Sequence, residues 1–253
     1  VGEFDWKTLG RIGIKTAVFI LLLNLIFALL TPIETLGRLS LYNYILTGRE
    51  RLPYGEVPAE SYNLSLYNIP AMFASHTLSQ PKADGEFRVI IIGDSGTWGW
   101  FLENPDTLAG QLNAINADND LQFYNLGYPV MSLTKDIMIL DEAMAYEPDL
   151  IIWPITLESF PPEKQLFPPI VQENEGRIRP LISQYNLNVE GENNFTSPSF
   201  LDQTIIGQRR NLADLLRLQQ YGFSWAATGI DQTIPPDPPL RKSDFDEDVS
   251  WQT

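Results

Sequence analysis

Cysteine is absent from the 253-residue sequence, and histidine occurs once, as His76. Without cysteine the chain has no disulfide, no thiolate ligands for an iron–sulfur cluster and no thiol nucleophile. A single histidine excludes a multi-histidine metal site built by this chain. We therefore expect a protein that carries neither a metal nor a redox cofactor of its own.

Positive charge is also scarce. Lysine and arginine number 17 against 32 aspartates and glutamates, which gives a formal net charge of -15 at pH 7. Proteins that bind nucleic acid present a basic patch or stripe, and no segment of this sequence is dominated by basic residues. The composition therefore argues against nucleic acid as a partner, while 44% hydrophobic residues are enough for the core of one medium-sized domain with an attachment.

Apolar residues are concentrated near the amino end, where residues 12–33 form an apolar stretch. About 20 such residues are enough for a helix to cross a bilayer. Lys7, Arg11 and Lys15 precede the stretch, so the positive-inside rule places the amino end in the cytoplasm and the main domain outside. The sequence thus predicts a single-pass protein of a cell membrane, with the lipid bilayer as a partner.

Two alternatives accompany this interpretation. A cleaved signal peptide shares the basic start and the apolar core, but no small-x-small cleavage site follows the stretch, which favours a retained anchor. Asn24 interrupts the apolar stretch. Its side chain either hydrogen-bonds a neighbouring transmembrane helix of a membrane complex or is satisfied by the backbone of its own helix.

The remainder is predicted to contain an α/β domain. Short apolar runs at residues 87–92, 121–125 and 149–153 are rich in β-branched and aromatic residues, as in buried strands, and helical patterns separate them. This alternation predicts right-handed βαβ units and a parallel sheet between helix layers.

The chain divides into five predicted regions. They are a cytoplasmic segment (1–11), a transmembrane helix (12–33), a membrane-proximal connector (34–86), the α/β domain (87–230) and an extended, acidic, proline-rich tail (231–253).

The first predicted strand runs directly into Gly93-Asp94-Ser95. Glycine permits a tight turn, which would present Ser95 at the carboxyl end of a parallel strand, where open α/β sheets bind ligands. Asn125-Leu126-Gly127 closes the second predicted strand, and Pro154-Ile155-Thr156-Leu157-Glu158 follows the third.

Across residues 87–160, these three blocks resemble those of the SGNH hydrolase superfamily, also called GDSL-type esterases and lipases. The resemblance implies a three-layer α/β/α, flavodoxin-like fold and an acyl-ester substrate. It also implies that Ser95 is the nucleophile, and that the amides of Ser95 and Gly127, with an asparagine side chain, stabilise the oxyanion.

Two parts of the family's pattern are missing. Leu157 stands where the family carries the oxyanion asparagine, and the Thr156 hydroxyl replaces it only if the loop is shifted by one residue. The family's histidine belongs to a late Asp-x-x-His block, whereas His76 precedes Ser95 and no histidine follows it. Three strands, against about five to six in a typical sheet, favour an incomplete sequence, whereas Leu157 favours loss of the chemistry.

Two functions therefore remain open. The first is an extracytoplasmic esterase or acyltransferase acting on lipid or cell-envelope acyl groups, with Trp98 and Trp100 either lining an acyl pocket or packing in the core. The second is a non-catalytic, single-span accessory subunit of a larger membrane complex, such as an electron-transfer or photosynthetic complex, to which it adds no cofactor.

Overall fold

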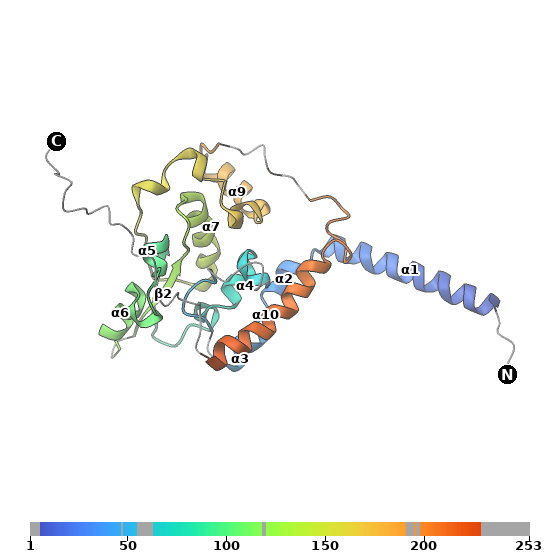
Figure 1. Ribbon diagram of the computed structural model, residues 1–253, viewed down its shortest axis with the longest axis horizontal. Helices are drawn as coiled ribbons and strands as arrows, with labels where there is room; N and C mark the ends of the chain where they lie inside the picture. The colour runs from blue at the N-terminus through green and yellow to red at the C-terminus, as the bar shows by residue number, and fades with distance from the viewer. Residues whose placement is uncertain are drawn as a thin grey trace.

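Three parallel strands lie at the centre of the structure, and one long helix projects away from them (Figure 1). The computed structural model describes residues 6–46, 48–54, 63–117, 120–190, 195 and 198–228. The predicted tail, residues 231–253, and residues 1–5 of the predicted cytoplasmic segment lie outside these ranges.

The strands are β1 (Phe87–Gly93), β2 (Leu121–Gly127) and β3 (Leu150–Ile152). The α-helices are α1 (Trp6–Leu30), α2 (Ile33–Gly37), α3 (Leu41–Ile45), α4 (Ile69–Ala74), α5 (Ser95–Trp98), α6 (Leu108–Ile115), α7 (Leu133–Ala143), α8 (Pro169–Gln172), α9 (Glu175–Tyr185) and α10 (Arg209–Thr228). Short 3₁₀ turns are η1 (Leu64–Leu66), η2 (Thr77–Ser79), η3 (Asn104–Asp106), η4 (Met144–Tyr146), η5 (Leu157–Ser159) and η6 (Pro162–Lys164).

The sheet has the order β2-β1-β3, with both neighbours parallel to β1. The central strand is buried from Arg88 to Gly93, as expected for a run of β-branched residues covered on both faces. β2 pairs with β1 from end to end, whereas β3 pairs over three residues only. The predicted α/β class and the parallel sheet are therefore confirmed.

Residues of the connector share the main hydrophobic core with the sheet. Leu52, Phe73 and Leu78 are fully buried in the same cluster as Ile90 of β1 and Ile139 of α7. The connector also extends the sheet locally, because Arg51 forms a parallel bridge with Asn125 of β2. Folding of the α/β part therefore depends on residues that precede its first strand.

Helix α1 is long and apolar enough to cross a membrane, and most of its side chains are exposed. It ends at Leu30, slightly before the end of the predicted span. Within it, the Asn24 side-chain amide donates a hydrogen bond to the Ile20 carbonyl at 2.9 Å. The Asn24 side-chain nitrogen is thus bonded within its own helix, whereas its oxygen has no hydrogen-bond partner among the described residues.

The segment after α1 is fixed to the domain by a buried carboxylate. Glu142 of α7 has a side chain only 4% exposed and accepts hydrogen bonds from Arg38 and from Arg177, each at 2.7 Å. Arg38 directly follows α2, and Arg177 belongs to α9. One buried charge therefore joins the membrane-proximal segment to two helices of the domain.

Helix α10 packs on the same segment. The Gln219 side chain accepts from the Leu41 amide at 2.8 Å and donates to the Leu39 carbonyl at 2.9 Å. Gly222 allows α10 to approach α3 closely, since a Cβ atom at position 222 would lie 1.9 Å from the ring of Tyr42 in α3.

We expect Gly222→Ala to destabilise the protein by about 1–3 kcal/mol, because the added methyl overpacks the α3–α10 contact. The measurement is urea denaturation of the full-length chain in detergent. Gly176→Ala in α9 is the matched control, because a Cβ there meets nothing within 4 Å. Equal transition midpoints for the two variants would contradict the packing described here.

Candidate functional site

Ser95 lies at the carboxyl end of β1, as the first residue of α5. The preceding residue, Asp94, caps this short helix, because its carboxylate accepts a hydrogen bond from the Gly96 amide at 2.9 Å. The side chain of Ser95 is half-buried. The strand-to-helix turn predicted from Gly93-Asp94-Ser95 is therefore present.

Two paired glycines allow α5 to lie against the sheet. Gly93 and Gly127 face each other in the β1–β2 register. A Cβ on Gly93 would lie 2.3 Å from the Thr97 hydroxyl oxygen, and one on Gly127 would lie 2.4 Å from the Trp98 nitrogen. Both positions therefore require glycine, because α5 packs directly on the ends of the strands.

Ser95 lines a pocket of about 710 Å³ whose walls are mostly apolar. The lining residues are Ser95, Gly96, Gly99, Trp100, Phe101, Leu102, Pro129, Val130, Met131, Lys164, Phe167 and Pro168. The two tryptophans next to Ser95 differ in role. Trp98 is fully buried and donates its indole N–H to the Leu52 carbonyl at 2.8 Å, whereas Trp100 is 40% exposed and lines the pocket.

One wall of the pocket is the loop of residues 99–102, whose backbone is strained and is hydrogen-bonded by a buried arginine. Phe101 has a φ of 66°, which is uncommon for a bulky residue. Buried Arg51 donates to the Leu102 carbonyl at 2.9 Å and to the Gly99 carbonyl at 3.2 Å. Its guanidinium also lies 4.7 Å from the centroid of the Trp98 ring. A connector residue thus sets the shape of this wall.

The predicted oxyanion donors already have acceptors within the protein. The Gly127 amide donates to the Asn125 side-chain oxygen at 3.0 Å, and the Thr156 hydroxyl donates to the Asp94 carboxylate at 3.0 Å. Leu157, at the position of the family's asparagine, points to solvent and is 88% exposed. The structure brings Ser95, Gly127 and Thr156 to one end of the sheet, but two of them serve its internal hydrogen bonding.

His76 is fully buried, and both ring nitrogens have partners. Nδ1 accepts from the Leu78 amide at 3.0 Å, so Nε2 carries the proton that it shares with the Asn125 carbonyl at 3.2 Å. The ring therefore links the connector to β2. Within the described ranges, Ser95 has no hydrogen bond to a histidine, lysine or carboxylate side chain that would serve as its base.

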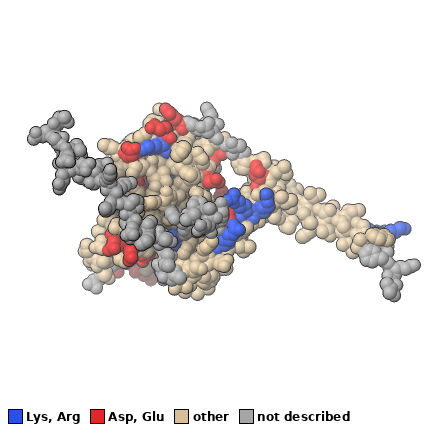
Figure 2. All heavy atoms as spheres, in the orientation of Figure 1, with Lys and Arg blue, Asp and Glu red and all other residues tan. Residues whose placement is uncertain are grey.

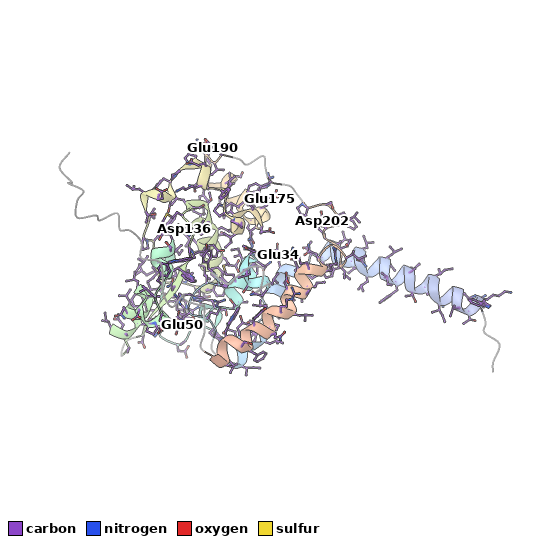
Figure 3. All side chains as sticks on the ribbon, viewed as in Figure 1. Glu34, Glu50, Asp136, Glu175, Glu190 and Asp202 are labelled. Atoms are coloured by element: carbon purple, nitrogen blue, oxygen red, sulfur yellow. The ribbon has the colours of Figure 1, made fainter. Side chains whose placement is uncertain are left out.

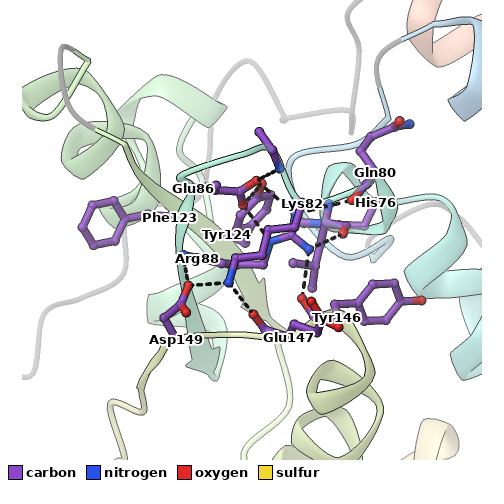
Figure 4. A network of polar contacts seen from close by, with 12 residues as sticks. His76, Gln80, Lys82, Glu86, Arg88, Phe123, Tyr124, Tyr146, Glu147 and Asp149 are labelled. Atoms are coloured by element: carbon purple, nitrogen blue, oxygen red, sulfur yellow. Dashed lines mark hydrogen bonds and ion pairs between the residues drawn. The ribbon is translucent and has the colours of Figure 1, made fainter.

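A separate polar network surrounds Arg88 near the amino ends of the strands (Figure 4). The Arg88 side chain pairs with Glu86 at 2.7 Å and donates to the Tyr146 carbonyl at 2.9 Å. The Tyr124 hydroxyl donates to the same Glu86 carboxylate at 2.9 Å, and burial together with this bond raises the pKa of Tyr124 to about 12. These contacts fix the start of β1 at the end opposite Ser95.

A buried lysine lies beneath the candidate site, and sequence reasoning did not identify it. The Lys135 ammonium donates to the Gly93 carbonyl at 2.9 Å, to the Tyr128 carbonyl at 3.1 Å and to the carboxylate of Asp136. Asp136 also accepts from the Trp153 indole at 3.2 Å. Burial lowers the pKa of Lys135 and raises that of Asp136. All three ammonium protons have acceptors, so Lys135 has a structural role.

One sequence signal could have revealed this lysine. Lys135, Met138, Ile139 and Glu142 follow the i, i+3, i+4, i+7 spacing of a buried helix face, and all four are buried. Two charged residues at core positions of α7 therefore require buried partners.

The described part of the chain contains no group of three or more histidine, cysteine, aspartate or glutamate residues arranged to hold a metal ion.

We expect Lys135→Met to lower the free energy of unfolding by about 3–5 kcal/mol at pH 7, because Asp136 is then buried without its cation. The pKa of Asp136 is raised in the folded state. The folded variant therefore binds a proton more tightly than the unfolded chain does, and it regains stability as the pH falls from 7 towards about 4.

Urea denaturation at several pH values measures both effects. Lys82→Met is the control, because Lys82 pairs with Asp149 at 2.6 Å near the surface and such pairs contribute about 1 kcal/mol or less. Equal losses of unfolding free energy for the two variants, or a loss in Lys135→Met that does not depend on pH, would refute the assignment of Lys135 and Asp136 as a buried ion pair.

Comparisons with protein-family models, with curated proteins and with solved structures find no match to this chain. The resemblance to SGNH hydrolases thus remains a prediction. It rests on three features at the ends of adjacent strands: Ser95 after β1, Gly127 at the end of β2 and the loop containing Thr156 after β3.

Proposed function

We propose that this protein is a membrane-anchored, SGNH-hydrolase-like domain that binds an acyl group in the pocket beside Ser95. The pocket carries the proposal. It has the volume of a small-molecule site, about 710 Å³, and its position beyond the carboxyl end of a parallel strand is where such folds bind ligands.

The lining favours an acyl chain over a polar ligand. Aromatic and aliphatic side chains dominate it, and Ser95 and Lys164 are the lining residues with polar side chains. Each methylene group that such walls bury contributes roughly 0.8 kcal/mol. Lys164 forms an ion pair with Glu158, so its charge is already balanced. The ligand that fits best is therefore a neutral ester whose carbonyl lies near Ser95.

The finer fold assignment belongs to the same proposal. The order β2-β1-β3 matches the first part of the flavodoxin-like order 2-1-3-4-5. The outer edge of β3 pairs with no other described strand, and Leu150 and Ile151 are 46% and 38% exposed. A fourth parallel strand would pair with this edge and cover these side chains, completing a three-layer α/β/α arrangement.

We further propose that these residues bind the acyl ester without cleaving it. Cleavage requires a base to take the Ser95 proton and donors for the oxyanion. Among the described residues, His76 is committed at both nitrogens, and the Gly127 and Thr156 donors have protein acceptors. An esterase or acyltransferase would therefore need its base from residues other than those that the structure describes.

His76, Gly127 and Thr156 already have hydrogen-bond partners within the protein. This also supports the second candidate, a non-catalytic single-span accessory subunit of a membrane complex. The membrane anchor, with the domain on the extracytoplasmic side, is common to both candidates and rests on the apolar helix α1 and the basic residues in its amino-terminal part.

Filling the pocket should abolish acyl binding. We expect Val130→Trp to weaken the binding of a fluorescent acyl ester at least about tenfold, because the larger side chain occupies space lined by Val130. Fluorescence titration of the full-length chain in detergent measures the affinity. Ile115→Trp is the control, since Ile115 is 76% exposed on α6 and does not line the pocket. Unchanged affinity in Val130→Trp would exclude this pocket as the site.

A serine-directed fluorophosphonate probe separates binding from catalysis. We expect no Ser95-dependent labelling of the purified chain, because no residue in the described ranges is placed to act as a base for its hydroxyl. Ser95→Ala and Ser199→Ala are compared with the unsubstituted protein. Labelling that persists in Ser199→Ala but disappears in Ser95→Ala would show an activated nucleophile and overturn the non-catalytic assignment.

A further inference from the structure

Basic side chains gather at the junction between α1 and the domain (Figure 2). Arg38 directly follows α2, and Arg209 and Arg210 are the first residues of α10, which packs against α2. The side chains of Arg38 and Arg210 are 47% and 70% exposed. Exposed positive charge here contrasts with the net charge of -15 of the whole chain.

Apolar side chains lie directly before these arginines. In residues 198–208, here called the juxtamembrane turns, Phe200, Leu201 and Ile206 are 50%, 73% and 66% exposed. The turns are ordered by their own hydrogen bonds. The Gln208 side chain donates to the Asp202 carbonyl at 2.8 Å, and the Arg209 guanidinium donates to the Ile206 carbonyl at 2.7 Å. They therefore present apolar groups to solvent from a defined backbone.

The juxtamembrane turns lie close to the level at which α1 would leave a bilayer. A helix of 25 residues is about 37 Å long, which exceeds the roughly 30 Å of a hydrocarbon core. Lys7, Arg11 and Lys15 all lie in the amino-terminal part of α1, so the uncharged residues 16–30 are the part that enters the hydrocarbon core, and the chain reaches the opposite headgroups where α1 ends. Figure 3 places Asp202 of the turns and Glu34 of α2 near this end of α1.

The junction is held in one orientation. Arg38 pairs with buried Glu142 at 2.7 Å, and Gln219 of α10 donates to the Leu39 carbonyl at 2.9 Å. Since α2 begins only three residues after α1 ends, the start of α10 stays near the end of α1.

We propose that the juxtamembrane turns and the arginines around them bind the surface of the bilayer that α1 spans. In this arrangement Phe200, Leu201 and Ile206 enter the interfacial region. Arg209 and Arg210 interact with the phosphates of anionic phospholipids. Apolar side chains flanked by arginine are the combination that interfacial segments use.

Asp202 and Asp214 have partners within the junction. The Asp202 carboxylate accepts from the Ser199 amide at 2.9 Å and its hydroxyl at 2.7 Å. Asp214 pairs with Arg217 at 2.7 Å and lies 3.9 Å from Arg210. Glu34 is exposed on α2, and its carboxylate would repel lipid phosphates. The proposed lipid contact is therefore centred on the start of α10.

Because the chain has no cysteine, single cysteines can report on this surface in the full-length protein. We would label Leu201→Cys and Ile206→Cys with a fluorophore and reconstitute each in phosphatidylcholine vesicles with and without phosphatidylglycerol. Lipids carrying a nitroxide near the headgroup quench a fluorophore at the membrane surface. Ile115→Cys, exposed on α6, is the matched control.

We expect quenching at residues 201 and 206 to be several-fold stronger than at residue 115, and stronger in the phosphatidylglycerol vesicles. Adding Arg209→Gln and Arg210→Gln should remove the dependence on phosphatidylglycerol, with an unchanged thermal midpoint to show intact folding. Equal quenching at residues 201 and 115 would overturn the proposal. Equal quenching in the two kinds of vesicle would overturn the role of the arginines. Neither result depends on the acyl pocket.

Discussion

The ammonium group of Lys135 holds the carboxyl ends of all three strands in one place. It binds the carbonyl of Gly93 at the end of β1 and that of Tyr128 just after β2, and it reaches Trp153 after β3 through Asp136. β3 has a short ladder of three residue pairs, so this buried pair supplements the backbone bonds that keep it in the sheet. The turn with Ser95, the glycine of β2 and the loop after β3 all start from the ends that Lys135 joins.

The hydrogen bonds that build this strand-end region use the groups that catalysis would need. The Gly127 amide donates to the Asn125 side chain, which in turn donates to the Thr97 carbonyl of α5, and the Thr156 hydroxyl ties the loop after β3 to Asp94. A donor already bonded in the resting protein must give up its acceptor before it can stabilise an oxyanion. The result is an ordered region beside an apolar pocket.

Local sequence patterns predicted the parts of the molecule that local chemistry determines. The β-branched run before Gly93 predicted β1, and the apolar stretch predicted a membrane-spanning helix, although α1 begins at Trp6 and ends at Leu30. The pocket was not predictable in this way, because Phe167 and Pro168 join it from a segment far from Ser95 in sequence. A connector that packs on the domain was predicted, but not which of its residues enter the core, since its turn-rich sequence has no sustained periodicity and its burial arises from long-range packing.

Helices α1 and α5 lie far apart along the long axis of the molecule (Figure 1). In Figure 1, α5 lies on the side of the domain away from α1, with the sheet between them. If α1 stands in a bilayer, the pocket beside Ser95 opens a domain's depth away from the lipid surface. Molecules would then reach this pocket from the aqueous phase and not by lateral diffusion within the membrane.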